Sequence, residues 1–157
     1  MLKVAIIDGS AISRGLLNTV LIDGGHEVIG DANTSPAGLA RMIKLQPNVV
    51  CVDIGTEPDR LSILDTLHHA LPRAIIFLVS GKIEPELVGE AVKHGVQGFI
   101  VKPFNSATVL KTIRSTILKF VQRQQTRKAA DEETGETEAL DLPEDGRNNS
   151  EQEPDLK

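Results

Sequence analysis

Four polar residues of this sequence follow short apolar runs, and their types suit phosphoryl chemistry. Asp8, Asp53 and Ser80 each end such a run, and Lys102 directly follows another. Carboxylates are ligands that Mg²⁺ accepts, while a hydroxyl and an ammonium group bind phosphoryl oxygens. If the four side chains meet, Asp53 can act as the nucleophile toward a phosphoryl donor. The residue types therefore predict a small polar site for a metal ion and a phosphoryl group.

Backbone groups beside these side chains complete the predicted site. A Mg²⁺ ion would take the two carboxylates and the backbone carbonyl of Gly55, which follows the second of them by two positions. The Lys102 ammonium would pair with one phosphoryl oxygen and the Ser80 hydroxyl with another. The backbone amide of Gly81 would add a further donor. Each of these groups acts on a different part of the transferring phosphoryl group.

Five short apolar runs alternate with longer segments of helical periodicity, and this order predicts how the site is positioned. Most runs are continuous, as expected of parallel strands covered on both faces. The intervening segments are long enough for crossover helices. The order predicts an α/β fold with a doubly wound five-stranded parallel sheet in the flavodoxin-like order 2-1-3-4-5, and helices on both faces. The predicted strands are residues 2–7, 27–30, 48–53, 74–79 and 98–101.

Local signals predict where several helices begin and end. Gly24 and Gly25 suit the left-handed end of the first helix. Ser35 followed by Pro36 is typical of an N-cap and a first helical residue. Asn105 is expected to cap the last helix. These signals agree with the element order that the apolar runs predict.

Bulk composition limits the classes of protein. A chain of 157 residues is long enough for one ordinary domain. The single cysteine, Cys51, excludes a disulfide framework and a cysteine-based metal cluster, and we expect it to be a buried, inert thiol. No signal-like segment opens the chain and no apolar stretch suits a bilayer, so we expect a cytoplasmic protein without membrane contact.

Charge is unevenly distributed along the chain, whose net charge is −5. Residues 1–125 hold 13 Lys and Arg against 11 Asp and Glu, whereas residues 126–157 hold 4 against 11. A nearly neutral body gives no support for direct nucleic-acid binding. Residues 129–157 contain few apolar side chains, which predicts disorder. We therefore predict one domain over 1–122, followed over 123–157 by a helix extension and an acidic disordered tail.

Four segments of the sequence resemble the receiver domain of two-component response regulators, of the CheY-like kind. The resemblance covers about residues 1–122. Its most specific part is an apolar strand followed by Lys102, Pro103 and Phe104, and in this family the Lys-Pro peptide bond is usually cis. The matching segments are residues 7–14, 52–54, 79–81 and 98–104.

This resemblance implies a signalling role rather than an enzyme's. Asp53 would accept a phosphoryl group from a sensor histidine kinase or a histidine phosphotransfer protein, with at most self-catalysed transfer and dephosphorylation. Ser80 and Phe99 would form the switch pair, whose rearrangement changes the face formed by the fourth helix, fifth strand and fifth helix. An unknown downstream protein would bind that face.

The sequence departs from the family pattern at the expected metal site. Family members usually carry two adjacent acids after the first strand, and here the second position is Gly9. Weaker Mg²⁺ binding is expected, although phosphate oxygens and water can complete the octahedron of this ion. Glu57 or Asp59 could supply the missing charge. The departure leaves an alternative open, in which a degenerate receiver binds partners without phosphorylation.

Other classes of function fit less well. A flavodoxin-like nucleotide binder needs a phosphate loop after the first strand, but residues 8–11 begin with an acid. A cobalamin module would need a histidine at the position of Ser10. We expect no DNA-binding output domain, since the tail is short and acidic. Output is then protein contact, and Leu118, Phe120 and Val121 near the end of the last helix would suit a homodimer.

Overall fold

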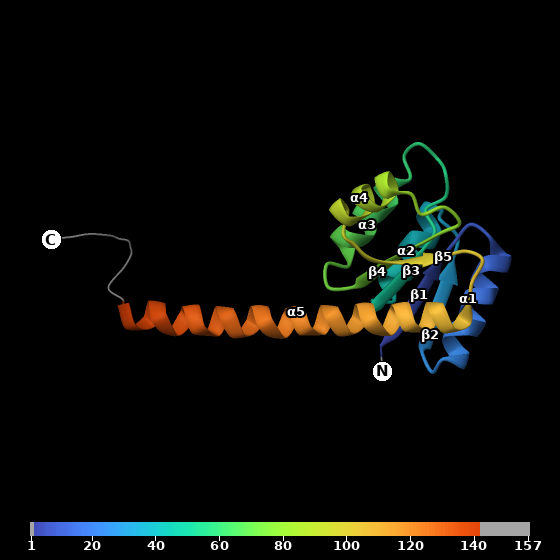
Figure 1. Ribbon diagram of the computed structural model, residues 1–157. Coiled ribbons are helices and arrows are strands. Elements are labelled where there is room, and N and C mark those ends of the chain that lie inside the picture. Colours follow the sequence, from blue (N-terminus) through green and yellow to red (C-terminus); the bar gives the residue numbers. More distant parts are fainter. Residues whose placement is uncertain (1, 142–157) are drawn as a thin grey trace. The chain divides into compact units, whose positions relative to one another are not determined.

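The structure of the chain, a computed structural model, describes the backbone of residues 2–141 and the side chains of residues 2–132. Five parallel strands form one sheet in the order β2-β1-β3-β4-β5 (Figure 1). This confirms the predicted α/β fold and its strand order. The strands are β1 (Lys3–Ile7), β2 (Glu27–Ala32), β3 (Val49–Val52), β4 (Ile75–Ser80) and β5 (Val96–Val101).

Two strands are longer than predicted, and pairing explains the difference. The second strand extends to Ala32 because its last residue pairs with Ile7 of β1. The fifth begins at Val96, which pairs with Ile76 of β4. Neither extension is a continuous apolar run, so hydrophobicity alone would not have included it. Ladder hydrogen bonds decide strand length here.

Two helices begin, and one ends, where the sequence signals predicted. Ser35 caps α2 by accepting a hydrogen bond from the amide of Gly38 at 3.0 Å, and Asn105 caps α5 by accepting one from Thr108 at 3.0 Å. Gly25 has φ of +87°, the left-handed conformation expected after α1. The helices are α1 (Ala11–Asp23), α2 (Pro36–Lys44), α3 (Leu61–Ala70), α4 (Pro85–Lys93) and α5 (Ser106–Asp141).

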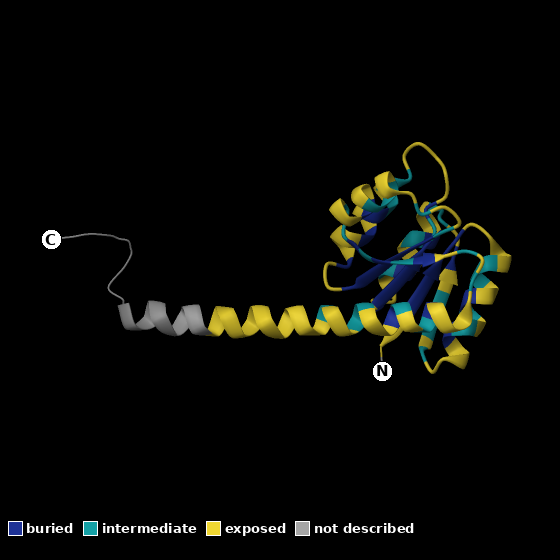
Figure 2. Cartoon of the chain, in the orientation of Figure 1, coloured by how far each residue is buried: buried dark blue, intermediate teal, exposed yellow. Residues whose placement is uncertain are grey.

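The core consists of two apolar layers, one on each face of the sheet (Figures 1 and 2). On one face, buried strand residues such as Val50 and Leu78 pack against Met42 of α2, Leu64 of α3 and Ala91 of α4. The other face is covered by α1 and by the first part of α5. Both layers are built mainly from aliphatic side chains, with Phe77 as a buried aromatic residue, in keeping with the low aromatic share of 3%. The strands are thereby fixed, and their carboxyl ends lie at one rim.

One prediction about the end of the chain is wrong. Disorder was expected from residue 129, but α5 continues to Asp141. Ala, Lys, Arg and Glu dominate residues 127–133, and these are strong helix formers even where they bury nothing. The remaining residues of the predicted disordered tail, 142–157, lie outside the described part of the chain.

The chain divides into two compact units, Met1–Leu118 and a second that begins at Lys119. The predicted boundary between residues 122 and 123 therefore stays a prediction, since α5 runs through both positions without a break. Of the helices that the structure describes, none combines the length and hydrophobicity that crossing a bilayer requires. The features described below all belong to the first unit.

Candidate functional site

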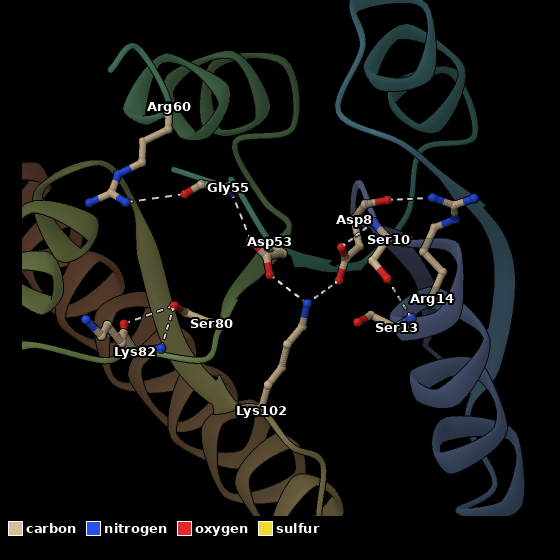
Figure 3. Close-up of polar contacts among 10 residues, drawn as sticks. All are labelled: Asp8, Ser10, Ser13, Arg14, Asp53, Gly55, Arg60, Ser80, Lys82 and Lys102. Carbon is tan, nitrogen blue, oxygen red and sulfur yellow. Dashed lines mark hydrogen bonds and ion pairs between the residues drawn. The ribbon is translucent and has the colours of Figure 1, made fainter. Parts of the chain in front are cut away.

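Three of the polar residues singled out above meet at one rim of the sheet (Figure 3). Asp8 follows β1, Asp53 follows β3 and Lys102 follows β5. The Lys102 ammonium donates to Oδ2 of Asp53 at 2.7 Å and to Oδ2 of Asp8 at 2.8 Å. Strand order explains the meeting, because β1 and β3 are neighbours and the side chain from β5 reaches across β4. The result is a cation bridging two carboxylates.

Backbone amides hold the other oxygen of each carboxylate. Oδ1 of Asp8 accepts from the amide of Ser10 at 2.8 Å, and Oδ1 of Asp53 accepts from the amide of Gly55 at 2.9 Å. The Asp8 side chain is 8% exposed, whereas the Asp53 side chain is 20% exposed. Of the two carboxylates, Asp53 is therefore the more accessible to a reagent from solvent.

The electrostatics of Lys102 follow from this arrangement. Its partial burial alone would lower the pKa of the ammonium group. Hydrogen bonds and charge attraction to Asp53 and Asp8 outweigh burial, so the pKa of Lys102 is raised above its ordinary value. The side chain is therefore a permanent cation at neutral pH. It can transfer from carboxylate to phosphoryl oxygens without changing its protonation state.

Gly55 shapes the turn after β3. Its φ of +76° is in the left-handed region, which glycine adopts without the steric cost that a side chain brings. Its carbonyl accepts a hydrogen bond from Nη1 of Arg60 at 3.3 Å. Glu57 and Asp59, the residues considered as extra acids, line a groove of about 500 Å³ between α2 and α3.

The predicted switch residues lie on β4 and β5 and make contacts of their own. The Ser80 hydroxyl donates to the carbonyl of Lys82 at 2.9 Å and accepts from its amide at 3.1 Å, so it closes the turn around Gly81 (Figure 3). Phe99 is half-buried on β5, where it pairs with Leu78 and packs against the core. In this structure neither side chain takes part in the bridge at Lys102.

Comparison with known proteins identifies the family. Residues 4–114 match the response regulator receiver domain. The chain belongs to the response regulator receiver family. Chemotaxis protein CheY of Thermotoga maritima is 31% identical over 114 residues, which are 71% of this chain and 93% of that protein. Chemotaxis protein CheY of Bacillus subtilis is 28% identical over 116 residues, covering 73% and 97%.

The fold agrees with that of solved receivers. The structure of Vibrio cholerae chemotaxis protein CheY4 superimposes with a TM-score of 0.65 at 27% identity, covering 74% of this chain and 98% of that one. Receivers of this family accept phosphoryl groups, generally bind Mg²⁺, and interact with histidine kinases or phosphotransfer proteins and with downstream targets. This receiver has the same five-stranded order and the same rim.

The residues of this receiver fit a hard cation, although with fewer charges than the usual pattern. Two carboxylates and the Gly55 carbonyl are the oxygen ligands that Mg²⁺ prefers. Gly9 adds none, and among the residues that the structure describes no three His, Cys, Asp or Glu side chains gather closely enough to hold a metal. Both carboxylates and that carbonyl also have hydrogen-bond donors already.

Sequence reasoning missed two arginines of this receiver. Arg14 lies one turn into α1, where Nη1 donates to the backbone carbonyl of Asp8 at 2.6 Å and Nε pairs with Asp31 of β2 at 3.0 Å. It thereby ties α1 and β2 to the loop that carries Asp8. Arg60, which donates to the Gly55 carbonyl, was not among the predicted site residues. A cation in the first turn after an acid-bearing loop is the only signal that pointed to Arg14.

Proposed function

We propose that this receiver accepts a phosphoryl group on Asp53 from the phosphohistidine of a sensor histidine kinase or a histidine phosphotransfer protein. The observation that carries the proposal is the Lys102 ammonium, which bridges Asp53 and Asp8 at 2.7 and 2.8 Å. A permanent cation in contact with the nucleophile is positioned to stabilise charge on the transferring group. The role is that of a phosphoacceptor with at most self-catalysed transfer and dephosphorylation.

The transfer step conserves atoms and charge. One carboxylate oxygen of Asp53 attacks the phosphorus atom and forms a P–O bond, while the P–N bond to the donor imidazole breaks. The imidazole leaves with the electron pair and takes a proton from solvent. Lys102 holds a phosphoryl oxygen during the step, and the Gly81 amide donates to another. The Ser80 hydroxyl leaves its contact with Lys82 to bind the product.

A divalent ion would be held by Asp8, Asp53 and the carbonyl of Gly55, and when bound it would neutralise charge on the phosphoryl oxygens. We expect weak binding because Gly9 offers no carboxylate. The rest of the site contributes independently of a metal. Lys102 is already in contact with the acceptor, and the amide of Gly55 orients its carboxylate.

Signalling would follow from rearrangement of the switch pair. Movement of the Ser80 hydroxyl toward the phosphoryl group would allow Phe99 to turn inward, which changes the face formed by α4, β5 and α5. A shallow groove on this face, lined by Phe99, Pro103 and Val109, supports its use by a protein partner. We place both phosphodonor and partner in the cytoplasm. A homodimer through α5 is a further part of the proposal, supported by the exposed Leu118.

Acetyl phosphate with Mg²⁺ and intact-mass measurement tests the proposal. We expect a gain of one phosphoryl group, about 80 Da, in the wild type. Asp53→Asn should show no gain, because an amide is not a nucleophile for this step. Asp23→Asn is the matched control, since it makes the same atom change at an exposed residue of α1 and should be phosphorylated like the wild type.

The alternative is a receiver that binds partners without phosphorylation. Gly9 favours it, and so does the hydrogen bonding of all four carboxylate oxygens of Asp8 and Asp53. No mass gain from acetyl phosphate, and none from a panel of histidine kinases and phosphotransfer proteins, would replace the first proposal by this one. A gain that persists in Asp53→Asn would contradict both.

A further inference from the structure

Arg60 is connected to the acceptor carboxylate through a single residue. The half-buried side chain leaves the chain just before α3, and its Nη1 donates to the carbonyl of Gly55 at 3.3 Å (Figure 3). The amide of the same Gly55 donates to Asp53 Oδ1 at 2.9 Å. A guanidinium group is therefore bonded to the carbonyl of the residue whose amide holds the acceptor carboxylate.

The local structure of α3 does not account for this position. Arg60 occupies the N-cap and makes no side-chain capping hydrogen bond. A cation at a helix N-terminus is unfavourable, because that end carries the positive end of the helix dipole. The ion pairs found within residues 2–132 involve other cations. The contact with Gly55 is thus the polar interaction that fixes the side chain.

The charges around the site indicate how the contact between Arg60 and Gly55 affects metal binding. Asp8 and Asp53 supply two negative charges, and Lys102 and Arg60 supply two positive charges. Gly9 contributes no charge, and the guanidinium group of Arg60 offsets part of the negative charge near the carboxylates, in the groove that Glu57 and Asp59 also line. The carbonyl that would complete the metal's ligands already accepts from a guanidinium group.

We propose that Arg60 occupies the Gly55 carbonyl in the resting site and opposes metal binding there, both by holding this ligand and by its positive charge. The inference deepens the proposed phosphoryl-accepting function and rests on it for the identity of the site. A metal ion reaching this site must displace the guanidinium group from the carbonyl. Removing the guanidinium group should then free a ligand and make the surroundings of the carboxylates more negative.

Calorimetric titration of the unphosphorylated full chain with MgCl₂ at low ionic strength tests the inference. We expect Arg60→Gln to bind Mg²⁺ roughly three- to tenfold more tightly than the wild type, the range for one unit charge removed near a partly exposed site. Arg73→Gln is the matched control, since Arg73 is exposed in the loop between α3 and β4. It makes the same charge change at the opposite end of the sheet and should bind like the wild type.

Two further variants complete the design. Asp53→Asn should lose the binding heat, which shows that the titration reports this site. Arg60→Lys keeps the charge but loses the guanidinium geometry, and we expect an affinity between those of the wild type and Arg60→Gln. If Arg60→Gln does not fold, the Arg60→Lys variant tests the inference in its place. In that case a Mg²⁺ affinity of Arg60→Lys equal to or below that of the wild type would contradict the inference.

Equal or weaker Mg²⁺ binding in a folded Arg60→Gln, or an equal gain in Arg73→Gln, would overturn the inference. The titration needs no phosphoryl donor, so its outcome is separate from that of the phosphorylation experiment. If Asp53 is never phosphorylated but Arg60→Gln binds Mg²⁺ more tightly, the proposed function fails while the role of Arg60 stands. If Asp53 is phosphorylated but Arg60→Gln binds Mg²⁺ like the wild type, the proposed function stands while the role of Arg60 fails.

Discussion

Gly9 is the residue at which this receiver differs most from the usual pattern of two adjacent acids. A Cβ atom at this position would meet no other atom within 4 Å, and the position is exposed. The backbone also avoids the left-handed region there, so a larger residue is sterically acceptable. Space therefore does not explain the glycine. Its effect on the site is one of charge and ligand number.

We predict that Gly9→Asp raises the affinity for Mg²⁺ by roughly tenfold, since it adds one carboxylate and one negative charge to the site. Isothermal titration calorimetry measures the change. Gly15→Asp is the control, because Gly15 of α1 is also exposed with open space around its Cβ position. That variant should bind Mg²⁺ like the wild type. No gain in Gly9→Asp would mean that position 9 does not face the metal ligands.

At the residue scale, the sequence predicted which side chains gather but not how they pair. Asp8, Asp53 and Lys102 were found because each stands where an apolar strand ends, and strand ends share a rim. The hydroxyl of Ser80 was expected to face the same group, yet it is bonded to Lys82. The contact of Arg60 could not be predicted, because a long flexible side chain is placed by neighbours that only the fold supplies.

At the scale of the elements, β3 is the most deeply buried strand, and Cys51 at its centre is fully buried. Burial raises the pKa of the thiol to about 12. We predict that the thiol does not react with a thiol reagent such as DTNB at pH 8 in the native protein, because thiolate is the reactive form. In denaturant it should react at once. Rapid native reaction would contradict the burial of β3.

His26 joins α1 to β2 and reports on the packing of α5. Burial, and then the nearby charge of Arg114 on α5, lower the pKa of His26 below its ordinary value of 6.5. A lowered pKa means that the folded state prefers the neutral imidazole. This contribution to stability is present above pH 6.5 and is lost as the pH falls through the folded-state pKa.

We therefore predict that the free energy of unfolding falls between pH 7.5 and pH 5, with a smaller fall in His26→Asn. Urea denaturation at a series of pH values measures both. His69→Asn is a suitable control, because His69 is an exposed histidine of α3 and its replacement should leave the pH dependence unchanged. An identical decline in His26→Asn and the wild type would show that other groups cause it.

The elements were predictable to different degrees. The alternation of helices with strands and the centre of every strand follow from apolar periodicity, and Ser35, Asn105 and the glycine pair each locate one end of a helix. The length of α5 did not follow from periodicity. Apolar burial was the criterion for order, and the side chains of residues 122–132 are exposed. Intrinsic helix propensity of the Ala, Lys, Arg and Glu residues was the signal that was underweighted.

At the scale of the whole molecule, charge separates along the chain as the composition indicated. The receiver unit carries the site, and the acidic residues are concentrated from Asp131 onward. The family match ends at residue 114, inside α5. The family match therefore covers most of the receiver unit, and the continuation of α5 beyond Lys119 lies outside it.

The central claim is that Asp53 is the phosphoacceptor, and chemical trapping of the acyl phosphate tests it most directly. The chain is incubated with acetyl phosphate and MgCl₂, reduced with sodium borohydride, digested, and its peptides are sequenced by mass spectrometry. Reduction converts a phosphorylated aspartate into homoserine, and we predict homoserine at position 53 alone. Homoserine at Asp8 or Asp59 with Asp53 intact would contradict the account, and so would a phosphorylated protein that yields no homoserine.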